Sequence, residues 1–150
     1  MPFADNKRLP FDERHVLVGL GKINISSINK DDQGLYKCTV VLLNSERSEM
    51  EFNLKVIAPS VLSPFSFPDN LEEGMRISII CSVISGDSPI TIKWFKNDQL
   101  IDSNIQSKYK IAVINEYVSS LIMDKVDKYY NGNYTCQSSN TLSSVNHTAS

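Results

Sequence analysis

The pattern Tyr-x-Cys occurs twice in this chain of 150 residues, in GLYKC (34–38) and again in GNYTC (132–136). From Cys38 to Cys136 the two copies are 98 positions apart. At the same offset, apolar residues precede both copies, namely Ile23, Ile25 and Ile28 in one and Leu121, Met123 and Val126 in the other. Because alternate residues of a strand share a face, each copy predicts a strand, a turn and a second strand.

Strand-like segments also precede the second copy. They are RISIICSV (76–83), ITIKWF (90–95) and YKIAVI (109–114), each bounded by Gly, Asp, Asn, Ser or Pro. β-branched residues dominate these apolar runs, and no stretch has a convincing helical period. Short strands with turn signals at this spacing predict an all-β chain, folded as a sandwich or a barrel.

The spacing of Cys81, Trp94 and Cys136 is more specific. The tryptophan follows the first cysteine by 13 residues, the second cysteine follows by 42 more, and Tyr134 stands two residues before it. This order is typical of an immunoglobulin-like Greek-key β-sandwich, in which the cysteines join the two sheets beside the buried tryptophan. We therefore predict a disulfide between Cys81 and Cys136, with Trp94 and Tyr134 in the core.

The first copy lacks the residues that would complete the same pattern. At an offset of 98, the counterparts of Cys81 and Trp94 would fall before residue 1. We therefore expect residues 1–58 to be the C-terminal half of an immunoglobulin-like domain, with Tyr36 in its core and Cys38 unpaired. Residues 59–150 are expected to form a nearly complete second domain, whose last strand is slightly truncated. The chain is thus interpreted as an internal fragment.

These motifs carry a family resemblance. The string DDQGLYKC, the Cys-Trp-Tyr-x-Cys set and the preceding LxMxxV resemble tandem immunoglobulin domains of the I-set type. The stretch SVLSPFSFPDNLEEGMRISIICSVISGDSPITIKWFKNDQLI (60–101), followed by GNYTCQSSN, resembles the arthropod Down syndrome cell adhesion molecule family. That resemblance implies a neuronal and immune cell-surface receptor whose variable domains pair with identical copies. One position departs from the pattern, because the Asp of the family's corner salt bridge is Asp32 in the first copy but Tyr130 in the second.

Composition bears on other functions. The 15 basic and 17 acidic residues are nearly balanced, and the basic residues are scattered, which argues against nucleic acid as a partner. The two histidines, His15 and His147, have no metal-ligand spacing. The segment VGLGK (18–22) is interpreted as a hairpin tip. We expect no catalytic, metal or cofactor site, and therefore a protein-binding function.

Strand alternation predicts which surface binds. If Cys81 faces the core, Ile77, Ile79 and Val83 do so too, and Ile80 faces outward. The inward Leu121 and Met123 likewise leave Ile122 outward on the same sheet. We predict adjacent Ile80 and Ile122 as anchors of a binding face, extended by Lys110 and Ala112. Isolated exposed apolar residues are nevertheless ordinary on protein surfaces.

Three N-glycosylation sequons begin at Asn24, Asn133 and Asn146. The chain is rich in Asn, Ser and Thr, so a similar number of sequons is expected by chance. The sequons alone therefore do not establish secretion. A glycan on Asn133 would disfavour the second domain's opposite sheet, near the outward Phe95, as a binding face.

Three functions remain open. The first is homophilic cell–cell adhesion in neuronal wiring or immune recognition, by an extracellular module whose signal peptide and membrane anchor lie outside the fragment. The second is a heterophilic ligand-binding receptor ectodomain. The third is an I-set spacer of an intracellular, titin-like muscle protein. A disulfide at Cys81 and Cys136 favours an oxidising compartment, and hence the first two.

Overall fold

The computed structural model describes residues 3–4, 7–8, 12–18 and 22–150. The chain divides into two compact units, Met1–Val56 and Ile57–Ser150. Both are all-β, with single 3-10 turns as their only described helices.

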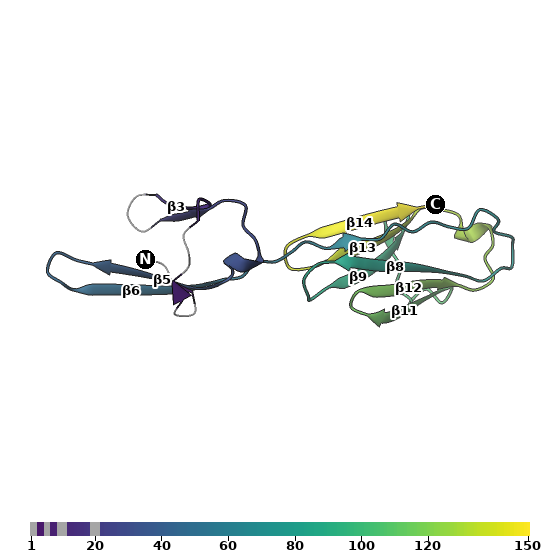
Figure 1. Ribbon diagram of the computed structural model, residues 1–150. Helices are drawn as coiled ribbons and strands as arrows, with labels where there is room; N and C mark the ends of the chain where they lie inside the picture. The colour runs from purple at the N-terminus through teal and green to yellow at the C-terminus, as the bar shows by residue number, and fades with distance from the viewer. Residues whose placement is uncertain (1–2, 5–6, 9–11, 19–21) are drawn as a thin grey trace. The chain divides into compact units, whose positions relative to one another are not determined.

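The second unit is a sandwich of two four-stranded sheets (Figure 1). One sheet has the order β10-β9-β13-β14 and the other has the order β11-β12-β8-β7. The elements are β7 (Val61–Leu62), β8 (Ile77–Ser85), β9 (Thr91–Lys96), β10 (Gln99–Leu100), β11 (Tyr109–Asn115), β12 (Val118–Met123), the 3-10 turn η2 (Lys128–Tyr130), β13 (Tyr134–Ser139) and β14 (Ser144–Ala149). The predicted immunoglobulin-like sandwich is therefore confirmed.

The core between these sheets is built around the disulfide Cys81–Cys136. Both cysteines are fully buried, and Trp94 is only 1% exposed. The indole nitrogen of Trp94 donates to the hydroxyl of buried Ser119 at 3.1 Å, which satisfies its one polar atom. Leu121 and other apolar side chains complete the core, each contributing about 1.5–3 kcal/mol when fully buried.

The turn before each Tyr-x-Cys strand has the same construction. The buried hydroxyl of Tyr134 donates to the carbonyl of Tyr130 at 2.7 Å, and that of Tyr36 donates to Asp32 at 2.6 Å. Gly132 just before the strand has a φ of 147°, in the region that favours glycine. A Cβ there would also lie 2.7 Å from the side-chain oxygen of Asn97, so the turn requires glycine.

In the first unit, the described strands form three two-stranded antiparallel sheets, β1-β2, β3-β4 and β5-β6. Their bounds, with those of the 3-10 turn η1, are β1 (Phe3–Ala4), β2 (Lys7–Arg8), β3 (His15–Leu17), β4 (Ile23–Ile25), η1 (Lys30–Asp32), β5 (Gly34–Val41) and β6 (Arg47–Leu54). The predicted hairpin in VGLGK is supported by the 2.8 Å bond from the amide of Val18 to the carbonyl of Lys22. Residues 19–21 lie outside the described residues.

The first unit leaves apolar side chains of β5 and β6 uncovered. Tyr36 is buried and stacks on Phe52 at 5.3 Å between ring centres, yet Phe52 itself is 46% exposed. Its strand neighbour Met50 pairs with Cys38 and is 70% exposed. Cys38 is a free thiol and only half-buried, whereas its counterpart Cys136 is fully buried.

Candidate protein-binding face

The outward side of the sheet β11-β12-β8-β7 carries the predicted binding residues. Along β8, Ile79 and Cys81 are 4% and 0% exposed, whereas Ile80 between them is 53% exposed. Ile77 and Val83 are buried as well, and so are Leu121 and Met123 of β12. The predicted alternation of both strands is therefore confirmed.

The register between β8 and β12 decides how the two predicted anchors lie relative to each other. Ile80 lies opposite Ser120, and Ile122 lies opposite Ser78. The hydroxyls of Ser78 and Ser120 meet at 2.7 Å across the sheet, so this serine pair occupies the close diagonal. The two isoleucines share a face but are not direct cross-strand neighbours. They lie on paired strands and are offset by two residues in register, because alternation fixes the face of a residue and not its cross-strand partner.

Strand β11 extends the same surface. Ala112 lies opposite Ser120 and Lys110 lies opposite Ile122, and both are exposed. The surface therefore consists of two rows across three strands. We name the following six residues the outer face: Ile80, Ser120 and Ala112 in one row, and Ser78, Ile122 and Lys110 in the other. Ile80 is its most exposed large apolar side chain, since Ile122 is half-buried.

A charged group borders the outer face at one end. Asp124 accepts from Lys110 Nζ at 2.6 Å and from Arg76 Nε at 2.9 Å. The hydrogen bond from Lys110, together with the charges of both partners, lowers the pKa of Asp124 below its usual value. Both basic side chains are more than two-thirds exposed, so these pairs contribute little to stability. The sequence contained this signal, because Asp124 follows Ile122 by two residues and so shares its face.

The other sheet of the second unit carries two of the three sequons. Asn146 is exposed on β14, and Asn133 is exposed immediately before β13. The third residues of these sequons, Thr148 and Thr135, are cross-strand partners whose hydroxyls lie 2.7 Å apart. Phe95 lies opposite Thr135, as the sequence indicated. Asn24, the third candidate acceptor, is exposed on β4 of the first unit.

A family model for the immunoglobulin domain matches residues 59–140, more than half of the chain. The chain belongs to the immunoglobulin domain family. It is 32% identical to human cell adhesion molecule DSCAM over 148 residues, which are 97% of the chain and 7% of DSCAM. It is 28% identical to Drosophila melanogaster cell adhesion molecule Dscam2 over 144 residues, again 7% of that protein. The chain thus spans about 7% of the length of these relatives.

Among solved structures, the Dscam1 Ig7 domain, isoform 5, superposes on the chain with a TM-score of 0.58 at 30% sequence identity. The match covers 61% of this chain and 92% of that domain. The relatives and this structure confirm the resemblance to the Down syndrome cell adhesion molecule family that residues 60–101 carry.

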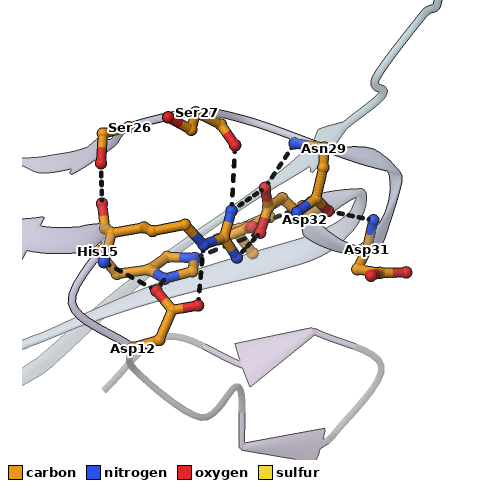
Figure 2. Close-up of polar contacts among 9 residues, drawn as sticks. Asp12, His15, Ser26, Ser27, Asn29, Asp31 and Asp32 are labelled. Carbon is orange, nitrogen blue, oxygen red and sulfur yellow. Dashed lines mark hydrogen bonds and ion pairs between the residues drawn. The ribbon is translucent and has the colours of Figure 1, made fainter.

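The corner next to Tyr36 in the first unit contains a charged network (Figure 2). The guanidinium of Arg14 forms two 2.9 Å hydrogen bonds with the carboxylate of buried Asp32, which also accepts from the amide of Asn29 at 2.8 Å. The bond from Arg14 is the main cause that lowers the pKa of Asp32 from 3.8 to about 2. His15 contacts Asp12 through Nδ1 at 2.8 Å.

The corresponding corner of the second immunoglobulin unit has no such ion pair. Tyr130 replaces the aspartate, and its hydroxyl donates to the carbonyl of Lys108 at 3.0 Å. Its ring packs edge-on against Tyr109, with ring centres 5.5 Å apart. The doubt that the sequence raised about a salt bridge here is therefore justified, and the hydroxyl of Tyr134 holds the turn.

Two negative findings concern the described residues of the chain. In residues 3–4, 7–8, 12–18 and 22–150, no helix has the length and apolar character needed to cross a membrane. Over the same residues, no three His, Cys, Asp or Glu side chains gather closely enough to hold a metal ion.

Proposed function

We propose that residues 59–150 form a cell-surface recognition module for homophilic cell–cell adhesion, with the outer face as its binding surface. The similarity to cell adhesion molecules supports the class of function. The observation that supports this particular surface is the contrast between the two sheets. The outer face presents Ile80 and Ala112 to solvent, whereas the other sheet is flanked by two candidate glycan acceptors.

The outer face has the composition that a self-associating surface needs. The Ser78–Ser120 hydrogen bond gives each hydroxyl one partner within the sheet, which lowers the cost of burying the pair against a partner. Asp124, Arg76 and Lys110 lie at the edge, where rim charges cost little to keep hydrated. A pair of identical faces would meet across a two-fold axis, with Ile80 as the central anchor on each side.

The setting of this module follows from the same proposal. Residues 1–58 would be the C-terminal half of a preceding immunoglobulin-like domain, and the parent protein would be anchored in the plasma membrane with this region outside the cell. The Cys81–Cys136 disulfide supports an oxidising, extracellular setting. Asn24, Asn133 and Asn146 would then be accessible to glycosylation, since all three side chains are exposed. Neuronal wiring or immune recognition is the proposed context.

The test compares Ile80→Lys with a matched control on the opposite sheet, Leu100→Lys. Leu100 is 50% exposed against 53% for Ile80, so the two changes add the same charge at similarly accessible apolar sites. Sedimentation equilibrium of the 150-residue chain would measure self-association, and thermal unfolding would measure stability. We expect Ile80→Lys to abolish self-association and Leu100→Lys to preserve it, with melting temperatures close to that of the unmodified chain.

Three results would contradict the proposal. A monomeric unmodified chain at all concentrations would exclude homophilic binding and point to a heterophilic ligand. Equal loss of association in both variants would show that the outer face is not the contact. A large fall in melting temperature for Ile80→Lys would mean that its side chain is structural. The cellular counterpart is sorting of two cell populations whose tethered receptors differ only in residues 60–150.

A further inference from the structure

Two lysines and a tyrosine, none of which belongs to the outer face, converge in the second unit. Lys96 is the last residue of β9, Lys108 immediately precedes β11, and Tyr129 belongs to η2. Lys108 Nζ lies 3.6 Å from the centre of the Tyr129 ring, and Lys96 Nζ lies 4.5 Å from it. Lys96 Nζ also donates to the backbone carbonyl of Tyr129. The Tyr129 side chain remains accessible, because the residue is 52% exposed.

The two ammonium groups lack the compensation that lysines usually have. Since each lies within 4.5 Å of one ring centre, they are at most about 8 Å apart. Among the described residues, neither lysine forms an ion pair with a carboxylate. Asp127 acts on Lys96 only at longer range, and its carboxylate is engaged by the amide of Tyr129 at 2.7 Å. Burial and the neighbouring charge of Lys108 lower the pKa of Lys96. The cluster therefore has surplus positive charge beside an exposed aromatic ring.

We propose that Lys96, Lys108 and Tyr129 form a binding site for an acidic saccharide. A sulfate group placed between the lysines would accept charge-assisted hydrogen bonds from both ammonium groups and relieve their mutual repulsion. The apolar face of a sugar ring would pack on the exposed ring of Tyr129, which an inorganic ion cannot do. The site uses none of the residues of the outer face, so it stands or fails independently of homophilic binding.

The experiment titrates the 150-residue chain, produced without glycans, with a sulfated heparin-derived hexasaccharide. Calorimetry would give the affinity, and NMR would follow the Tyr129 ring signals. A desulfated hexasaccharide and inorganic sulfate serve as the two reference ligands. The variants are Lys96→Gln combined with Lys108→Gln, Lys108→Gln alone and Tyr129→Leu. The control is Lys93→Gln, which removes the same charge from an exposed position on the same strand.

We expect the sulfated hexasaccharide to bind, to shift the Tyr129 signals and to lose affinity at high salt. The double variant should bind at least about tenfold more weakly, while Lys93→Gln should change the affinity less than twofold. Tyr129→Leu should weaken binding of the sulfated hexasaccharide but not binding of inorganic sulfate. If the double variant does not fold, Lys108→Gln alone decides, because the Lys108 side chain lies over Tyr129 and forms no hydrogen bond or ion pair with the described residues.

The proposal is overturned if the hexasaccharide does not bind, or if Lys93→Gln weakens binding as much as the cluster variants. The second result would mean diffuse attraction to surface charge. If the desulfated hexasaccharide binds as tightly as the sulfated one, the lysines do not recognise sulfate. If inorganic sulfate binds as tightly as the sulfated hexasaccharide, the sugar ring contributes nothing to binding.

Discussion

The Cys81–Cys136 disulfide should supply a large share of the stability of the second unit. The two cysteines are 55 residues apart in the sequence. In the chain-entropy model, closing a loop of this length stabilises the folded state by about 4 kcal/mol at 25 °C. Typical domains have a net stability of only about 5–15 kcal/mol. Replacing both cysteines by alanine should therefore remove between a quarter and most of the free energy of unfolding.

The assay can isolate the second unit within the whole chain. Trp94 is the only tryptophan of the protein, and it is buried in the same core as the disulfide. Its fluorescence during urea unfolding therefore reports on residues 57–150 alone. We expect the midpoint of this transition to fall sharply in the double alanine variant. Cys38→Ser should leave it unchanged, because Cys38 is a free thiol of the first unit.

The size of the loss tests the reasoning. A decrease below about 1 kcal/mol would refute the loop-closure argument, because the unfolded chain would then gain little freedom from losing the cross-link. A comparable decrease for Cys38→Ser would contradict the assignment of the first cysteine as structurally separate. Below the unfolding transition, a reductant should leave the disulfide largely intact, since Cys81 and Cys136 are fully buried.

Two further predictions concern the tyrosine corners. Tyr134→Phe should lower the free energy of unfolding, measured by Trp94 fluorescence, by about 1–3 kcal/mol, because it removes a partly buried hydrogen bond and leaves the carbonyl of Tyr130 without its partner. Tyr130→Phe should lower it by less than about 1 kcal/mol, because the hydrogen bond of that hydroxyl is exposed. The pKa of Asp32 is lowered from 3.8 to about 2 in the folded state, so its ionised form stabilises the first unit above about pH 4, and this stabilisation is lost as the pH falls toward 2. A carboxyl NMR titration would measure that pKa, and Arg14→Gln should raise it; an unchanged pKa would contradict the role of the guanidinium.

Strand alternation was sufficient to predict the faces of β8 and β12. The inward positions of Ile79, Cys81 and Leu121 and the outward position of Ile80 follow from a period of two, which the backbone of a strand imposes on any sequence. The register between strands has no such local cause. It depends on turn lengths and packing across the sheet, so the separation of Ile80 from Ile122 by a serine pair was not predictable.

The same limit affects contacts made through loops. Tyr129 is 21 residues from Lys108 and 33 from Lys96 in the sequence, and no periodicity connects them. The repeat offset also changes along the chain. His15 pairs with Ile25, whereas Tyr109 pairs with Met123, so the hairpin β11-β12 is four residues longer than β3-β4. Upstream of this hairpin the offset is therefore 109 − 15 = 94 instead of 98, and with either value the counterparts of Cys81 and Trp94 fall before residue 1.

When the difference in hairpin length is included, the residues of the two corners can be aligned. His15 corresponds to Tyr109 by strand pairing, so Arg14 corresponds to Lys108. In the first unit the basic residue is neutralised by Asp32. In the second unit the aspartate is replaced by Tyr130, which packs against Tyr109 through its ring.

Two consequences follow from this exchange. The corner of the second unit has no carboxylate at the position of Tyr130, so it lacks the ion pair whose stabilisation the first corner loses as the pH falls toward 2. The basic side chain of Lys108 is also left without its acidic partner, and it lies over Tyr129 instead. The surplus charge of the proposed saccharide site therefore arises from the same substitution that removed the salt bridge. Tyr130→Asp should restore a partner for Lys108 and weaken binding of the sulfated hexasaccharide, although none of the three proposed site residues is changed.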